Sequence, residues 1–178
     1  QWIQATKLVA SDGSDGDNFG YKVGISDNTV IIGAPYNDDG SAYIYRFDDN
    51  TWIEEAKITA SESTIWFGYS VSIEGDSALV GAAGHNSFTG AAWLYKFNGK
   101  HWLEEIKYLA SDGSSQDQFA QSLCMDENNI IIDALQDGEN GTESGSAYVF
   151  EIPILPQTLT VDDDGKADFN NIQAAVDA

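Results

Sequence analysis

The sequence predicts an all-β protein built from three similar units, and two features carry that prediction: a 50-residue repeat and a two-residue alternation of apolar side chains. The repeat opens at Trp2, Trp52 and Trp102, which gives units at residues 2–51, 52–101 and 102–151. Further landmarks keep the same spacing: Lys7, Lys57 and Lys107; Ala10, Ala60 and Ala110; Ser11, Ser61 and Ser111. A fixed period of about 20 to 50 residues is typical of units that stack and share a core. The three units are therefore expected to pack side by side.

Within each unit the apolar side chains follow the period of a β-strand. Tyr43, Tyr45 and Phe47, for example, fall on one face of their segment. Turns rich in Gly, Asn and Asp separate such runs, because these residues accept left-handed backbone at little cost. Four short strands are expected per unit, starting in the first unit near Trp2, Phe19, Thr29 and Ser41. Four strands are the content of one β-propeller blade.

The unit also resembles a known family. The first copy, KLVASDGSDGDNFGYKVGISDNTVIIGAPYNDDGSAYIYRF, contains Phe19-Gly20 and Gly33-Ala34-Pro35 and is similar to an FG-GAP repeat. The drifted copies are Phe67-Gly68 with Gly81-Ala82-Ala83, and Phe119-Ala120 with Asp133-Ala134-Leu135. The resemblance implies propeller blades of the kind found in the integrin α-subunit head and in many secreted bacterial proteins. It also implies a secreted or cell-surface location.

Three blades are too few for an ordinary propeller, which closes with about 4 to 8. An incomplete or open propeller is expected, with two unpaired sheet edges. These edges could be covered by further blades, by other chains in a ring, or by the next subunit in a fibre. A homo-oligomer is therefore among the expected partners.

Residues 152–178 differ from the repeats. After the prolines comes a predicted strand at residues 158–161, an acidic turn, and an amphipathic helix with Asp168 as its N-cap. This segment resembles the start of a right-handed parallel β-helix of the pectin-lyase type, which implies a chain that continues past Ala178. No catalytic residue can be transferred from that resemblance.

Composition excludes several partners. Eight Lys and Arg against 29 Asp and Glu give a formal charge of −21. Binding to nucleic acid or to an anionic membrane surface requires clustered cations, so neither is expected. No apolar run reaches the roughly 20 residues of a membrane-spanning helix, so membrane insertion is not expected either. Hydrophobic residues at 42% and aromatic residues at 12% predict a folded chain.

Asp12, Asp15 and Asp17 are the candidate metal ligands, because closely spaced carboxylates on a Gly-rich loop can converge on a hard cation. A solvated turn is the favoured interpretation, since the other two copies keep fewer carboxylates. The calcium loop of integrin-type repeats has no counterpart here: the connection at residues 26–29 is too short to supply six to eight oxygens. No cofactor is predicted, and calcium is weighed but not favoured.

Aromatic residues supply the candidate partner surface. Trp66 and Phe88 break the repeat, and a residue that the fold does not require is a better candidate for binding. Trp93 and Tyr36 join them as candidate platforms. By contrast, the tryptophans that open each unit recur with the period and are expected to pack between blades.

No catalytic site is predicted. Glu54-Glu55 and Glu104-Glu105 recur at the repeat period and point to opposite faces of a strand, which indicates a structural role. Neither histidine has a nucleophile arranged with it. Cys124 takes the position of Gly24 and Ser72, which predicts a buried, inert thiol. Asn140 begins the sequon Asn-Gly-Thr and is a candidate glycosylation site.

The leading hypothesis is a non-enzymatic extracellular binding or scaffold module of an adhesin-like or cell-surface protein, with a protein or carbohydrate as partner. One alternative is a subunit that self-assembles into a ring or filament through open β-edges. A second is the accessory part of a larger polysaccharide-active β-helix enzyme.

Overall fold

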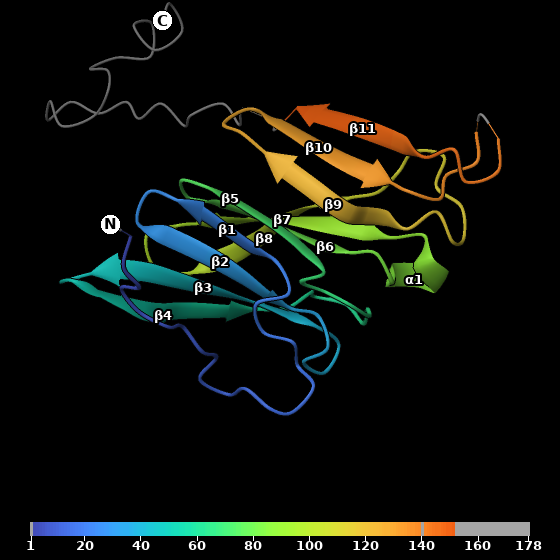
Figure 1. The fold of residues 1–178 in the computed structure, drawn as a ribbon. Coiled ribbons are helices and arrows are strands. Elements are labelled where there is room, and N and C mark those ends of the chain that lie inside the picture. Colours follow the sequence, from blue (N-terminus) through green and yellow to red (C-terminus); the bar gives the residue numbers. More distant parts are fainter. Residues whose placement is uncertain (1, 140, 152–178) are drawn as a thin grey trace, which may run out of the picture.

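The computed structural model describes residues 2–139 and 141–151, and these form three antiparallel β-sheets (Figure 1). The first sheet has the order β1 (Val23–Ser26), β2 (Thr29–Ala34), β3 (Ser41–Asp48), β4 (Thr51–Ile58). The second repeats it as β5 (Ser70–Glu74), β6 (Ser77–Ala82), β7 (Ala91–Phe97), β8 (Trp102–Tyr108). The third contains β9 (Phe119–Met125), β10 (Asn129–Ala134) and β11 (Ser146–Glu151). The short α1 (His85–Phe88) lies between β6 and β7. The prediction of an all-β fold of propeller-type blades in an open arrangement is confirmed.

The three sheets stack face to face, with β5 packed between β1 and β9 (Figure 1). One core joins the first and second sheets: Ile31 and Ile44 of the first meet Val71, Val80 and Trp93 of the second. A second core joins the next pair in the same way, with Leu79, Leu94, Ile130 and Ile132 among its members. Because the middle sheet is covered on both faces, every residue of β6 is buried.

The sheets are out of phase with the sequence repeats. The strand that opens the second unit, β4, pairs with the last strand of the first unit, so that Trp52 lies opposite Phe47. The strand that opens the third unit, β8, completes the second sheet in the same register, with Trp102 opposite Phe97. The third sheet therefore has three strands in the described chain instead of the expected four. The strand predicted near Trp2 is not formed, and Trp2 is fully exposed.

Neighbouring sheets are joined at their ends by the Phe of the FG motif. Phe67 forms a parallel bridge with Gly40, and Phe119 does the same with Gly90. Gly40 has a φ of 103°, and a Cβ added to it would lie 2.3 Å from both the N and the O of Phe67. Only glycine permits this close approach of two backbones.

The outer faces of the stack differ from the internal ones. Val23 and Ile25 of the first sheet are exposed, and so are Ile131 and Val149 of the third. Cys124 is also exposed, so the prediction of a buried thiol is wrong. Gly24 and Ser72, its counterparts, contact Ile73 and Met125 of the following sheet, whereas no described sheet follows the one that contains β9. The strand and helix predicted within residues 152–178 lie outside the described residues.

Candidate binding surface

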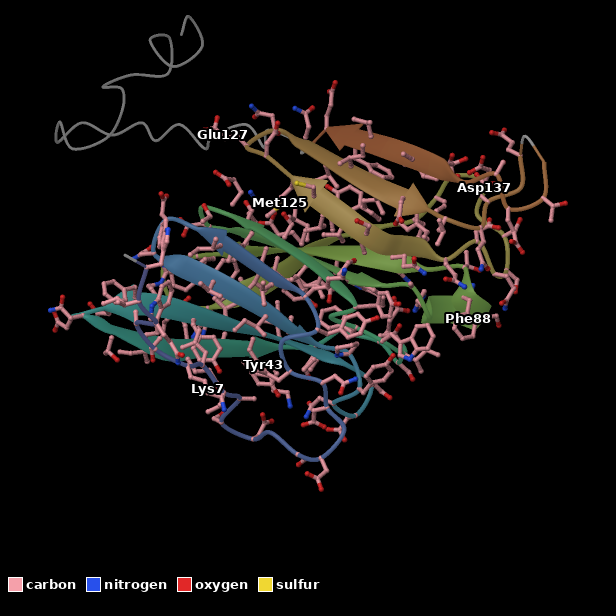
Figure 2. The ribbon with its side chains drawn as sticks, in the orientation of Figure 1. Lys7, Tyr43, Phe88, Met125, Glu127 and Asp137 are labelled. Carbon is pink, nitrogen blue, oxygen red and sulfur yellow. The ribbon has the colours of Figure 1, made fainter. Side chains whose placement is uncertain are left out.

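All the connections that carry candidate site residues lie at one end of the three sheets. In an antiparallel blade, the segment before the first strand, the connection from second to third strand, and the segment after the fourth meet at the same end. The short turns at Asp27-Asn28 and Asp49-Asn50 lie at the opposite end. The loops that carry candidate site residues in successive sheets are thereby neighbours. Figure 2 shows Phe88 and Asp137 at this end.

Five rings form one aromatic cluster there: Tyr21, Tyr36, Trp66, Tyr69 and Phe88. Trp66 is stacked on Tyr69 with centroids 5.5 Å apart and lies 5.1 Å from Phe88 and 6.3 Å from Tyr36. Tyr21 joins the set through Tyr69, at 4.8 Å. The cluster draws on the first two sheets and on α1. Three of the four residues predicted as a partner surface are thus brought together.

The fourth, Trp93, is not at the surface. Its side chain is completely buried on β7, against Phe67 at 5.6 Å and His85 at 5.4 Å. The prediction is wrong because Trp93 takes the position of Tyr43 on a sheet that is covered on both faces. At this position of β7 both faces of the middle sheet are covered, so the side chain has no solvent side.

The backbone presents Trp66 and Phe88 in an uncommon conformation. Trp66 has a φ of 66° and Phe88 a φ of 64°, both in the left-handed region that bulky residues rarely enter. Asn18 and Gln118 hold the position of Trp66 in the other units and share the conformation. The left-handed turn is therefore a property of the repeat, and only the second unit places a tryptophan on it. Such conformations cluster at binding sites, where surrounding contacts fix them.

The third unit fixes the loop that carries Phe88. The carbonyl of Phe88 accepts a hydrogen bond from the N–H of Gln118 at 2.8 Å, and the carbonyl of Ser87 accepts one from Gln116 N–H at 3.3 Å. The Ser115 hydroxyl also donates to Ser87 O, at 3.0 Å. These contacts hold α1 against the loop that precedes β9, with the Phe88 ring 5.1 Å from Trp66.

Two tyrosines of the cluster were missed in the sequence. Tyr21 and Tyr69 both follow the FG dipeptide, in FGYKV and FGYSV. The strand expected to start near Phe19 would include Tyr21, but β1 begins only at Val23. The recurrence of the FGY tripeptide in two units was the available signal. A hydrogen bond with Tyr69, together with burial, raises the pKa of Tyr21 to about 12.

The three predicted metal ligands do not converge. Asp12 accepts hydrogen bonds from Lys57 at 2.6 Å and from Tyr43 OH at 2.7 Å, and these hold its pKa below the usual range. Asp17 accepts from Ser14 N–H and from the side-chain amide of Asn37. Asp15 is exposed. Metal binding by these three residues stays a prediction, although two of them already have partners.

A different set of carboxylates gathers in the third unit. Asp112, Asp137 and Glu139 have carboxylate oxygens within 4.8 Å of one another, and they line an open pocket of about 560 Å³, here called the acidic pocket. The Tyr148 hydroxyl donates to Asp112 at 2.7 Å and to Asp137 at 3.3 Å. Hydrogen bonds, the largest from Ser146, lower the pKa of Asp137. These residues are candidate ligands for a hard cation.

The paired glutamates take part in the fold. Glu54 accepts from the Ser11 N–H at 2.9 Å and from its hydroxyl at 2.7 Å. Glu104 repeats this with Ser61. Glu55 pairs with Arg46 at 2.6 Å and accepts from Trp102 Nε1 at 3.0 Å. Asn140, the predicted glycosylation site, lies outside the described residues.

Stacked antiparallel sheets of three or four strands, joined by Phe and Gly at one end, define a protein of β-propeller-type blades. The family model of the FG-GAP repeat matches residues 2–45, 52–95 and 102–150, and the chain belongs to this family. No curated protein matches the chain significantly. The β-helix resemblance of the C-terminal segment finds no support.

FG-GAP repeats are found in extracellular and adhesion proteins and are generally non-enzymatic binding modules. Within the described residues, no helix is long and apolar enough to cross a membrane.

Proposed function

We propose that this chain is a non-enzymatic, extracellular binding module of a cell-surface or adhesion protein, and that its partner docks on the aromatic cluster. The observation that carries the proposal is the convergence of five rings from separate loops on the end of the stack. Tyr36 is 40% exposed, and the other four rings are half-buried. Rigid, partly exposed Trp and Tyr rings are the residues most enriched at the centres of protein interfaces.

Charge supports a basic protein segment as the partner. The chain has a formal charge of −21, and the loops next to the cluster carry acidic residues. Asp38 and Asp39 follow Tyr36 on one side. On the other side, Gln116 contacts the α1 loop and also lines the acidic pocket. Lys and Arg side chains of a partner could contact both the rings and this acidic rim.

The proposal is tested with arrayed Lys- and Arg-rich peptides beside arrayed neutral glycans. The Trp66→Asn variant is expected to lose at least about 30-fold in affinity for the basic peptides, the effect of removing an interface residue worth roughly 2 kcal/mol. Raising the salt concentration should weaken binding further. Phe47→Asn is the matched control, because Phe47 is 41% exposed but lies at the opposite end of the sheets.

If the chain binds the glycans and not the peptides, the partner is a carbohydrate and the proposal of a basic protein segment is wrong. An equal loss of affinity in Trp66→Asn and Phe47→Asn would show that the partner does not dock on the aromatic cluster. The accessory role in a larger polysaccharide-active enzyme depends on residues beyond those described and stays a prediction.

A further inference from the structure

The two outer faces of the stack match the two faces that meet inside it. Ile131 and Val149 on the third sheet are 47% and 69% exposed, whereas their counterparts in the first sheet, Ile31 and Ile44, are completely buried against the second. Val23 and Ile25 on the first sheet are 67% and 68% exposed. Their counterparts Val71 and Ile73, at 9% and 5%, are buried against the first sheet.

We propose that two copies of this chain dock head to tail through these faces, and that residues 2–8 of each copy add a fourth strand to the third sheet of the other. The interface is one that the chain already forms twice within itself. The occupant of each open face is therefore a surface that is present in the same molecule.

Residues 2–8 have the sequence features of the fourth strand that the third sheet lacks among the described residues. β3 and β7 each pair with a strand that carries Trp as its first or second residue and Lys five residues later, as in Trp52 and Lys57. β11 is the third such strand, and no described strand pairs with its outer edge. Trp2 and Lys7 have the same spacing, and Trp2 is fully exposed. An unpaired edge of this kind is a template for strand addition.

The internal pairs predict the register of the added strand. Tyr43 lies opposite Lys57 and Trp93 opposite Lys107, so Tyr148 is expected opposite Lys7. By the same rule Ala147 would face Leu8. The residues that follow Glu151 in this chain, IPILPQTLTVDDD, lack both the Trp and the Lys of the repeated strand. The segment at residues 2–8 of a second copy therefore fits the edge better than residues 152–164 do.

The ion pairs of the first two sheets also support a second copy as the occupant of this edge. In the first sheet Lys57 pairs with Asp12, and in the second Lys107 pairs with Glu62. Asp112 holds the equivalent position in the third unit, but none of the ion pairs among the described residues includes it. Its carboxylate lies in the acidic pocket beside Asp137 and Glu139. Lys7 of a second copy, on the added strand, would bring the missing cation to this pocket.

When residues 2–8 pair with β11 of another copy, the first sheet of their own chain needs little rearrangement. Ile58 ends β4 and at the same time packs on the second sheet, with Ala60 beside it. Leu8 and Ala10 already pack on the first sheet in the same way. The hydrogen bond from Tyr45 OH to Val9 O, at 2.8 Å, matches the one from Tyr95 OH to Thr59 O.

Blade number sets the stoichiometry. Two copies of the three sheets in the described residues supply six blades, which is within the 4 to 8 of closed propellers, whereas three copies would supply nine. Because the contact joins unlike faces, it closes only if the rotation completes a ring. A two-copy ring is the expected assembly.

The first test is the mass of the 178-residue chain in solution, measured by light scattering after size exclusion. The expected mass is twice the 19.3 kDa of one chain. Lys7→Glu should weaken association at least tenfold, whereas Lys100→Glu, the same charge change in the exposed turn before β8, should not. A wild-type monomer, or an open series of larger species, would overturn the proposal. So would a monomer that dimerises only when residues 152–178 are removed.

The second test does not depend on the folding of a charge variant. A Cβ on Gly24 would lie 3.6 Å from Ile73 N, and Met125 N donates to Ser72 Oγ at 3.2 Å. The third such contact would place Cys124 of one copy beside Ile25 of the other. Ile25→Cys should therefore give a disulfide-linked dimer with the native Cys124 under mild oxidation. Leu103→Cys, half-exposed on β8, is the control, and equal cross-linking by both variants would contradict the predicted interface.

Discussion

The Nε2 atom of His85 lies 3.0 Å from the Nζ atom of Lys107, deep beside the ring of Trp93. A lysine ammonium can only donate, so Nε2 must be the unprotonated acceptor. Nδ1 then carries the proton and donates to Thr64 Oγ1 at 3.1 Å. His85 is thus held as a neutral imidazole, and burial together with the Lys107 charge lowers its pKa, although Glu62 opposes the shift.

This contact predicts a loss of stability in mild acid. Because the pKa of His85 is lower in the folded state than the usual value of about 6.5, its contribution is complete above pH 6.5 and is lost as the pH falls toward the folded value. The free energy of unfolding of wild type should fall in this window by up to about 1.4 kcal/mol per pH unit more than that of His85→Gln. Urea titrations at several pH values measure it. His101→Gln, in the exposed β7–β8 turn, is the control, and an identical slope in wild type and His85→Gln would refute the assignment.

The FG phenylalanines predict a graded series of stabilities. Phe67 is completely buried and packs on Trp93 and Tyr95, so Phe67→Ala should lower the free energy of unfolding by about 3 to 5 kcal/mol. Phe19 makes the same ring contacts with Tyr43 and Tyr45 but is only half-buried on an outer face. Phe19→Ala should cost clearly less in the monomeric chain. Equal costs by urea denaturation would show that the two positions are equally covered in solution.

The sequence predicted the strands well because the apolar alternation reports directly which residues share a face. It could not predict at which point of the repeat each sheet begins and ends. A strict repeat looks the same wherever the unit is cut, and only the pairing of Trp52 with Phe47 shows that each opening strand belongs to the preceding sheet. The exposed Trp2 and the three-stranded third sheet both follow from that phase.

The candidate site was predicted where residues break the repeat, as Trp66 and Phe88 do. Trp93 was misplaced because alternation assigns a face but does not say whether a neighbouring sheet covers it. The acidic pocket could not be predicted from the sequence, because its carboxylates, Asp112 and Asp137, are 25 residues apart and meet only through the loop packing of the third sheet.

Two glycines allow the stability cost of close packing to be measured apart from the cost of a left-handed backbone conformation. Gly40 and Gly20 both have left-handed φ angles, 103° and 94°, but a Cβ at Gly20 would meet nothing within 4 Å. Gly20→Ala should therefore cost only the conformational penalty of about 1 to 2 kcal/mol. Gly40→Ala would in addition drive a methyl group into the backbone of Phe67 and separate the first two sheets. Its melting temperature should be much the lower of the two, and similar values would argue against the tight Gly40–Phe67 contact.

The left-handed turn at Trp66 predicts that stability and binding separate there. In Trp66→Asn the contacts with Tyr69 and Phe88 are lost, but the backbone gains a residue that tolerates a φ of 66°, as Asn18 does at the equivalent position. The free energy of unfolding should change by less than about 1 kcal/mol, because strain relief offsets the lost contacts. Trp66→Val loses the same contacts while placing a β-branched residue on the turn, and should be about 1 to 2 kcal/mol less stable than Trp66→Asn. Chemical denaturation of the two variants measures this difference; if they are equally stable, the turn imposes no penalty, and the tryptophan is held there by packing alone.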